Sequence, residues 1–185
     1  MLVAGPARSG RTTALATIAE AVVGAGGVAV VLAGRRSWLD RVPGTSVAAS
    51  PDAVAATVDR VEGRPVVVLV DDAEGVEDPS GALTAVVGGA GAGAHVAVAV
   101  RADAARGLYD HWTKLVRGSR LGVLLRPDLH LDGDLLGTAL PRRVAVPLVP
   151  GRGFLVVDGA AALVQVALPA AACGDAEADP RRPRS

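Results

Sequence analysis

The segment GPARSGRT, residues 5–12, decides how this sequence folds. It fits the pattern G-x-x-x-x-G-[K/R]-[S/T], with arginine at the position where lysine is expected. Residues 1–4 before it are apolar, and residues 12–23 after it carry Leu, Ile, Ala and Val at helical spacing. A strand, a glycine-rich turn and a helix in this order predict a phosphate-binding loop and the first unit of an α/β fold.

The predicted loop offers the groups that bind a phosphate chain. Gly5 and Gly10 allow close approach of the backbone, whose N–H groups can then point at phosphate oxygens. The helix after the loop adds the positive end of its dipole, and the Thr12 hydroxyl is placed to bind Mg²⁺. The residues predicted to bind ATP are Gly5, Pro6, Ala7, Arg8, Ser9, Gly10, Arg11, Thr12 and Thr13. A glycine-rich turn that binds nothing is the alternative, and the position between a strand and a helix argues against it.

Arg11 is the unusual member of the loop. Lysine at this position would be a compact charge, whereas arginine is longer, planar and forked, and the two are not interchangeable at tight sites. Arginine still neutralises phosphate charge. We therefore expect nucleotide binding to tolerate Arg11 better than nucleotide hydrolysis does.

A second motif lies at the end of the apolar run VVVLV, residues 66–70, which Asp71 and Asp72 follow. In a parallel sheet the carboxyl end of this strand lies beside the phosphate loop. Asp71 is predicted to hold Mg²⁺ through water or Thr12, and Asp72 to polarise the attacking water. Aspartate is one methylene shorter than the glutamate usual at the second position, and a misplacement of about 1 Å can cost about 10²-fold in rate. The alternative is a surface turn with two solvated acids. The phosphate-loop motif earlier in the chain argues against this alternative.

Strand and helix patterns alternate after the loop. Further apolar runs at residues 28–32, 96–100 and 121–125 have the composition of buried parallel strands. Helical patterns separate them: one begins at Ser50-Pro51-Asp52 with a serine cap, one at Asp78-Pro79, and one covers residues 102–116. This order predicts a mostly parallel sheet with helices on both faces. Residues 154–157 and 163–167 predict a terminal β-hairpin around Asp158-Gly159.

Composition limits the class of protein. Half of the 185 residues are hydrophobic (50%) but only 2% are aromatic, so the core must be aliphatic. The formal net charge of +0 gives no overall attraction to nucleic acid or acidic membranes. The single cysteine, Cys173, excludes a disulfide framework and indicates a reducing compartment. The sequence contains no secretory signal and no apolar stretch of the roughly 18 to 20 residues that span a membrane, so we expect a cytoplasmic chain without direct membrane insertion.

We predict one domain over residues 1–168, an α/β fold of the RecA-like P-loop NTPase type. Residues 169–185 are rich in Ala, Asp, Pro and Arg without periodicity, which predicts a disordered tail. The three histidines are not spaced as metal ligands, and a zinc site is not expected.

The order of these motifs resembles the C-terminal ATPase domain of the FtsK/SpoIIIE superfamily, including the degenerate modules of EccC-like ATPases of type VII secretion. The more specific part of the resemblance is the later order, in which DGDLLG (residues 132–137) precedes PGRG (residues 150–153) and a final strand pair. The resemblance covers about residues 1 to 168. It implies a domain that works in a ring or tandem array, whose relatives use ATP to move double-stranded DNA or to export proteins, in some cases within a membrane-anchored complex.

The resemblance also implies further catalytic residues beside Asp72. A sensor is expected at the tip of the strand after the acidic pair, where Arg101 lies. An arginine finger is expected on the edge that faces a neighbouring subunit. Arg117 and Arg120 are the nearest matches, and the sequence does not choose between them. A solvated arginine at a helix end is the alternative for each.

Three functions agree with the sequence. The first is a domain that binds ATP with Mg²⁺, hydrolyses it weakly or not at all, and regulates or assembles a DNA- or protein-translocating machine. The second is a competent DNA-translocating motor ATPase that DNA or a partner activates. The third is a small-molecule P-loop kinase whose lid arginines come from residues 101–126. The acidic pair after a long apolar strand and the terminal hairpin favour the first two.

Overall fold

A computed structural model describes residues 1–33, 37–61, 63–89 and 93–170. The strands are β1 (Leu2–Gly5), β2 (Val28–Ala33), β3 (Thr45–Val47), β4 (Val66–Asp71), β5 (Ala94–Arg101), β6 (Leu121–Leu125), β7 (Arg152–Val157) and β8 (Ala160–Gln165). The α-helices are α1 (Arg11–Gly24), α2 (Pro51–Arg60), α3 (Ala82–Val87), α4 (Ala102–Gly107) and α5 (Thr113–Gly118). Short 3-10 helices cover Trp38–Arg41, Ala73–Gly75 and Asp132–Leu136.

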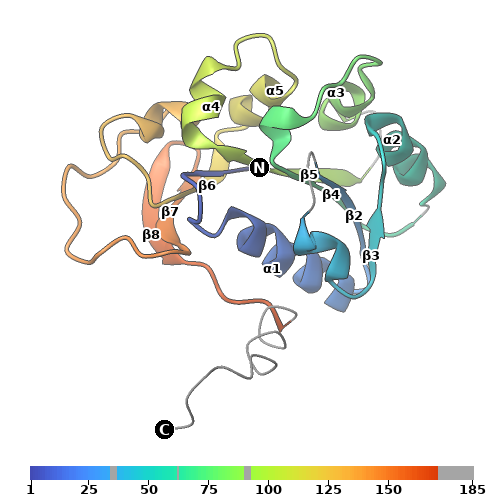
Figure 1. Ribbon diagram of the computed structural model, residues 1–185, viewed down its shortest axis with the longest axis horizontal. Helices are drawn as coiled ribbons and strands as arrows, with labels where there is room; N and C mark the ends of the chain where they lie inside the picture. Colours follow the sequence, from blue (N-terminus) through green and yellow to red (C-terminus); the bar gives the residue numbers. More distant parts are fainter. Residues whose placement is uncertain (34–36, 62, 90–92, 171–185) are drawn as a thin grey trace, which may run out of the picture.

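The strands form one sheet of eight in the order β3-β2-β4-β5-β1-β6-β7-β8. Strands β1 to β6 pair in parallel, and the hairpin β7–β8 extends the sheet in antiparallel pairing beside β6. Helix α1 covers one face of the sheet and α2 to α5 cover the other (Figure 1). The predicted α/β fold with a mostly parallel sheet, helices on both faces and a terminal hairpin is therefore confirmed.

Two aliphatic layers hold the sheet between its helices. Neighbouring residues of a strand point to opposite faces, so a strand that is covered on both sides is apolar throughout. In β4, Leu69 packs in the layer under α1, whereas Val68 and Val70 pack in the layer under the other helices. All three side chains are fully buried. This explains why the continuous run at residues 66–70 carried a clear strand signal.

The strand order brings the two predicted motifs to one edge of the sheet. Strand β5 lies between β1 and β4, and Gly5 at the end of β1 is in register with Arg101 at the end of β5. The chain leaves β1 through α1 on one face and leaves β5 through α4 and α5 on the other (Figure 1). Ligands of open α/β sheets bind at such a point, outside the carboxyl ends of the strands.

Two helix predictions were wrong in detail. The single helix expected over residues 102–116 is interrupted between α4 and α5, because Trp112 Nε1 donates a hydrogen bond of 2.8 Å to the Val76 carbonyl and holds this part of the chain against another loop. The helix expected from Asp78-Pro79 begins only at Ala82, because the Asp78 carboxylate accepts hydrogen bonds from the backbone of Leu83 and Thr84.

Other local predictions were confirmed or refined. Ser50 caps α2, and its hydroxyl accepts a hydrogen bond of 3.2 Å from the Ala53 amide. Strand β8 begins directly after Asp158-Gly159, earlier than predicted, and β3 was not predicted at all. Within the described ranges, no helix has the length and apolar character needed to cross a membrane. Residues 171–185 of the predicted tail lie outside the described residues.

Candidate functional site

The predicted phosphate loop connects β1 to α1 at the carboxyl edge of the sheet. Its first part, Pro6 to Arg8, is exposed, whereas Ser9 is fully buried. Gly10 has a φ of 98°, a conformation that glycine adopts without steric cost. A Cβ atom at Gly10 would lie only 3.2 Å from the backbone nitrogen of Gly151. The loop therefore needs glycine here both for its turn and for the approach of a second segment.

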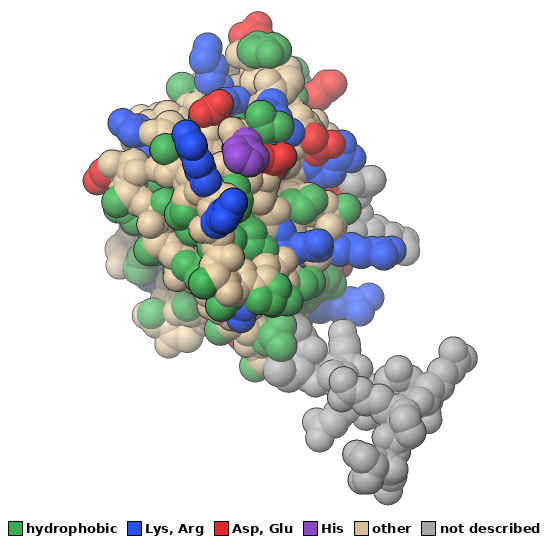
Figure 2. All heavy atoms as spheres, turned by 90° about the vertical axis from the view of Figure 1, so that its left-hand side faces the viewer, with side chains coloured by type: hydrophobic (Ala, Val, Ile, Leu, Met, Phe, Trp, Pro, Cys, Tyr) green, Lys and Arg blue, Asp and Glu red, His purple; other side chains and the backbone are tan. Residues whose placement is uncertain are grey.

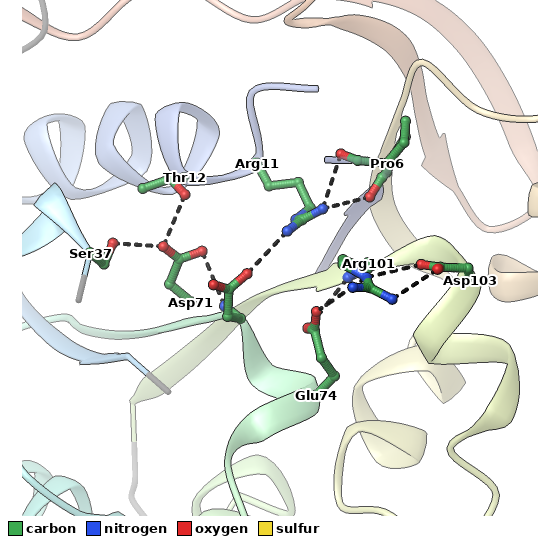
Figure 3. Close-up of polar contacts among 10 residues, drawn as sticks. Pro6, Arg11, Thr12, Ser37, Asp71, Glu74, Arg101 and Asp103 are labelled. Carbon is green, nitrogen blue, oxygen red and sulfur yellow. Dashed lines mark hydrogen bonds and ion pairs between the residues drawn. The ribbon is translucent and has the colours of Figure 1, made fainter. Parts of the chain in front are cut away.

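Two hydroxyl groups surround the first acid of the pair. Thr12 Oγ1 donates to Asp71 Oδ2 at 2.9 Å, and Ser37 Oγ donates to the same oxygen at 2.6 Å (Figure 3). Asp71 Oδ1 accepts the Asp72 amide at 3.1 Å, and only 4% of Asp71 is exposed. The structure thus brings Thr12 and Asp71 together, as the sequence predicted, and adds Ser37.

The donor set of this cluster fits Mg²⁺, which prefers oxygen ligands and keeps several waters beside one or two carboxylates and substrate phosphates. Among the residues with described positions, no group of three His, Cys, Asp or Glu side chains forms a metal cage. Thr12 and Asp71 would therefore hold the ion together with phosphate oxygens and water.

Arg11 turns back into its own loop. Its Nη1 atom donates to the carbonyl oxygens of Gly5 at 2.7 Å and Pro6 at 3.0 Å (Figure 3). Its Nη2 atom donates to Asp72 Oδ1 at 3.0 Å, in an ion pair whose side chains are 11% and 26% exposed. The cation predicted to bind phosphate is thus paired with the carboxylate predicted to polarise water. The sequence did not predict this pairing.

Arg101, the predicted sensor, lies at the same edge but faces α4. Its guanidinium donates to Asp103 at 2.9 and 3.2 Å, and its Nε atom lies 3.9 Å from Glu74 Oε1 (Figure 3). The hydrogen bond to Asp103 raises the pKa of Arg101, and the same bond lowers the pKa of Asp103. Arg101 is therefore a fixed positive charge beside the loop, with its donors directed at acidic neighbours.

Arg117 and Arg120, the candidate fingers, lie near the amino ends of the parallel strands, whereas the loop lies at their carboxyl ends. Both come before β6, whose carboxyl end adjoins the loop. Arg117 Nη1 donates to the Ala105 carbonyl at 2.9 Å, and Arg120 Nη2 donates to the Gly137 carbonyl at 2.7 Å. The structure does not bring them to the loop of their own chain. A finger role for either residue would require a neighbouring subunit at that edge.

A segment near the end of the described chain braces the loop. The Gly151 amide donates to the Ser9 carbonyl at 2.8 Å, and Pro150 lines the hollow above the loop. The sequence analysis used residues 150–153 as part of the resemblance but did not assign them to the site. Their glycines and proline are a turn signal, but a turn pattern gives no indication of which distant backbone it meets.

Two open hollows flank the loop. The hollow above it has a volume of about 320 Å³ and is lined by Arg8, Ser9, Gly10, Arg11, Thr12, Thr13, Trp38 and Pro150. The other, of about 460 Å³, lies beside Pro6 and Ala7 and is lined mainly by arginine and aspartate. Ion pairs already join Arg101 to Asp103 and Arg106 to Asp132 there. The first hollow therefore contains the groups suited to a phosphate chain.

Comparisons with solved structures find this fold in EssC and in EccC, a type VII secretion ATPase. The cytoplasmic domain of EssC superposes with a TM-score of 0.65 at 19% identity, over 90% of this chain and 39% of that chain. ATPases 2 and 3 of EssC from Geobacillus thermodenitrificans give 0.65 at 20% identity, over 90% and 36%. The cytoplasmic domain of the type VII secretion ATPase EccC from Thermomonospora curvata gives 0.65 at 20% identity, over 90% and 23%.

No protein-family model and no curated protein matches the sequence. The chain spans about two fifths or less of the three solved chains named above, with coverages of 39%, 36% and 23%. At 19 to 20% identity, these likenesses establish the fold that the chain shares with ATPase domains. The chemistry of the site must be argued from its own residues.

Proposed function

We propose that this chain is an FtsK/SpoIIIE-type P-loop domain that binds ATP with Mg²⁺ and hydrolyses it weakly or not at all. It would regulate or assemble a protein-translocating machine. The observation that carries this proposal is the Arg11–Asp72 ion pair inside an otherwise well-formed phosphate loop. The pair engages Arg11 and Asp72, on which hydrolysis depends, and leaves the contact between Thr12 and Asp71 in place.

Binding would rest on the loop backbone and the start of α1. The amides around Ser9 and Gly10, with the positive end of the helix dipole, suit phosphate oxygens. Thr12 and Asp71 are hydrogen-bonded to each other and would hold Mg²⁺, which supplies charge neutralisation for the β- and γ-phosphates. Ser37 donates a second hydrogen bond to the same Asp71 oxygen and helps to orient the carboxylate. Hydroxyl partners of this kind fix the direction of a metal-binding carboxylate.

Weak hydrolysis follows from the engagement of both residues that would act on the γ-phosphate. Asp72 accepts a hydrogen bond from Arg11 and is held in an ion pair, so its carboxylate is oriented toward Arg11. The Nη1 atom of Arg11 must leave the Gly5 and Pro6 carbonyls before it can donate to a phosphate oxygen. Phosphoryl transfer depends almost entirely on positioning and charge stabilisation, so an arrangement that must first be broken lowers the rate.

The comparisons support a secretion machine more than a DNA translocase. The neighbours are proteins with several ATPase domains, and the EccC protein of ATPases 2 and 3 was solved in complex with a signal sequence peptide. We propose a tandem or ring assembly with other ATPase domains, on the cytoplasmic side of a membrane-anchored complex, with a secreted protein as the substrate. On the face shown in Figure 2, basic side chains are scattered among acidic and hydrophobic ones, so this face offers DNA no continuous basic track.

A competent motor ATPase remains the second candidate, because the Thr12–Asp71 half of the site is intact. In that case a partner or DNA would have to release Asp72 from Arg11. The kinase alternative has less support. Residues 101–126, from which its lid would come, form α4, α5 and β6 and belong to the packed domain.

Equilibrium binding and turnover measured on the same preparation test the proposal. We expect the intact chain to bind ATP more tightly with Mg²⁺ than without it, and to turn it over far below about 1 per second, the low end of common enzyme rates. Thr12→Ala should lose most of the Mg²⁺ dependence, whereas Thr57→Ala in α2 serves as a matched control. Absence of ATP binding contradicts the proposal. Substantial turnover stimulated by double-stranded DNA supports the motor candidate instead.

A further inference from the structure

A hollow of about 530 Å³, the α5 hollow, lies between the segment that enters α3 and the start of α5. These helices cover the face of the sheet opposite α1 (Figure 1). The hollow shares no lining residue with the two hollows at the phosphate loop, so the nucleotide site does not account for it. Its acidic lining residues are Glu77, Asp78 and Asp110, and its apolar lining residues are Pro79, Trp112 and Leu115.

Hydrogen bonds hold the two sides of the α5 hollow together. Trp112 Nε1 donates to the Val76 carbonyl at 2.8 Å, and His111 Nε2 lies 3.1 Å from the same oxygen. Asp78 Oδ2 accepts the Thr84 amide and the Thr84 hydroxyl, each at 2.8 Å. Trp112 is only 7% exposed and packs in the core, so the hollow has a fixed wall.

Two carboxylates of the α5 hollow are available to a cation. Glu77 and Asp110 are exposed, and within the described ranges neither side chain forms a hydrogen bond or an ion pair. The lining has three acids against one lysine, Lys114, and therefore carries negative charge. Leu115, 49% exposed, adds apolar surface at the same place. A partner that suits this surface carries both positive charge and apolar groups.

The sequence itself contains a segment of this kind. Pro180-Arg181-Arg182-Pro183-Arg184 lies outside the described residues and carries three positive charges within five residues. The nearby acids Asp175, Glu177 and Asp179 all precede it. Each proline restricts φ to values that favour polyproline II, in which residues three apart lie on the same side. Segments with prolines at this spacing bind grooves lined by aromatic residues, and Trp112 with Pro79 provides such a lining.

The position of Ala170 favours the hollow of a second molecule over that of the same chain. The Ala170 amide donates to Glu20 Oε2 at 2.8 Å, so the chain is held on the α1 face. Residues 171–179 separate this point from Pro180 and span at most about 30 Å when fully extended. A domain of this length is roughly 40 Å across, and a path to the opposite face must also pass around an edge of the sheet.

We propose that residues 180–184 of one copy bind the α5 hollow of a second copy of this chain. In this contact the prolines pack on Trp112 and Leu115. The arginines pair with Glu77 and Asp110. Because the contact joins different surfaces of the two molecules, it extends from copy to copy and does not close a two-fold dimer. The inference goes beyond the proposed function and does not depend on nucleotide binding.

The two tryptophans of the chain allow the site of binding to be located by nuclear magnetic resonance. Trp112 lines the α5 hollow, whereas Trp38 lines the hollow above the phosphate loop. The intact, ¹⁵N-labelled chain would be titrated with a synthetic peptide of residues 179–185, DPRRPRS. We expect the indole N–H signal of Trp112 to shift and that of Trp38 to stay. The same peptide with its arginines replaced by glutamine should shift neither signal.

Removing the two available carboxylates tests the charge pairing. Glu77→Gln combined with Asp110→Asn should weaken peptide binding by about 5-fold, since each exposed ion pair contributes a factor of about 1.5 to 5. Asp59→Asn combined with Asp158→Asn is the matched control, because it removes two exposed carboxylates on α2 and in the hairpin turn. The control should bind the peptide like wild type. Equal affinity of wild type and the Glu77/Asp110 variant overturns the proposal.

Sedimentation of the intact chain tests whether the contact joins two copies. We expect the mean mass to rise with protein concentration, and Arg181→Gln, Arg182→Gln and Arg184→Gln together to keep the chain monomeric. A wild-type chain that stays monomeric well above the Kd of the peptide overturns the assignment to a second copy. A titration that shifts only the Trp38 signal, or neither tryptophan signal, overturns the α5 hollow as the site. All of these results are independent of whether the phosphate loop binds ATP.

Discussion

The pairing of Arg11 with Asp72 shows how one side chain changes what a phosphate loop can do. A lysine ammonium is a single point charge, whereas a guanidinium presents several donors in a fixed plane. Arg11 uses this geometry to bind two loop carbonyls and a carboxylate at once. The same reach that makes arginine a good phosphate ligand therefore also allows it to pair with the Asp72 carboxylate.

Replacing Arg11 by lysine should release Asp72. Lysine cannot bridge the Gly5 carbonyl and Asp72 with a planar fork, so we expect Arg11→Lys to raise ATP turnover by about 10-fold or more, since a positioned base contributes about 10²-fold or more. Phosphate release measures the rate. Arg60→Lys, at the exposed end of α2 and away from the loop, is the control. Unchanged turnover with intact ATP binding would show that the ion pair does not limit hydrolysis.

We expect Ser37 to strengthen the binding of Mg²⁺ at the site. Its hydroxyl donates to Asp71, and the loss of such a partner commonly weakens metal affinity by about 10-fold or more. We expect Ser37→Ala to need about 10-fold more Mg²⁺ for half-maximal ATP binding, as measured by titration at fixed ATP. Ser46→Ala, at an exposed position of β3, should leave the Mg²⁺ dependence unchanged. If both variants titrate like wild type, Ser37 has no role at the metal.

The residues of the candidate site differ in how far the sequence could predict them. Thr12 and Asp71 were placed together because each follows a strand of one parallel sheet, and their side chains do meet. Ser37 carried no such signal, because a serine before a short 3-10 helix is an ordinary cap. The Arg11–Asp72 pair could not be predicted either, because it depends on the distance between two elements and on one rotamer.

For single helices, the sequence pattern predicted the start correctly where a capping residue was present and no distant residue competed. Ser50 followed by Pro51 predicted the start of α2, and the structure has the cap bond. The helix predicted over residues 102–116 is divided into α4 and α5, and between them Trp112 donates to the Val76 carbonyl. Helical spacing cannot reveal a competing partner that is distant in sequence.

The cap of α2 gives a stability prediction for an element away from the site. Ser50→Ala removes the side-chain acceptor of the Ala53 amide and should lower the free energy of unfolding by about 1 kcal/mol. Urea unfolding followed by circular dichroism measures the loss. Ser50→Asp keeps an acceptor at the cap and should stay close to wild type. A loss of equal size in both variants would argue against the cap bond as its cause.

For the whole molecule, the order of strands and helices was predictable because continuous apolar runs alternate with helical spacing along the chain. The position of β3 at one sheet edge was not, because Thr45–Val47 is short and mostly exposed. Nor does a sequence pattern state that residues near 151 return to the loop near residue 9. The architecture was therefore predictable, and the long-range contacts that complete the site were not.

Nucleotide binding should stabilise the whole domain. At a concentration of about 100 times Kd, a ligand that binds only the folded chain adds about 2.7 kcal/mol. For a domain of this size we expect Mg-ATP to raise Tm by roughly 5 to 10 °C, since each kcal/mol shifts Tm by about 2–4 °C. Differential scanning calorimetry tests this. AMP, which lacks the β- and γ-phosphates, should give a much smaller shift, and equal shifts for AMP and ATP would contradict a phosphate-centred site.

The hydrogen bond from the Gly151 amide to the Ser9 carbonyl also sets the point in protein synthesis at which the loop can gain its support. The loop is synthesised before its brace, because Gly151 follows strands β1 to β6 in the chain and precedes only β7 and β8. A nascent chain can thus fold its parallel core while it still lacks the turn that supports the loop. We therefore expect tight nucleotide binding only once synthesis has passed Gly151.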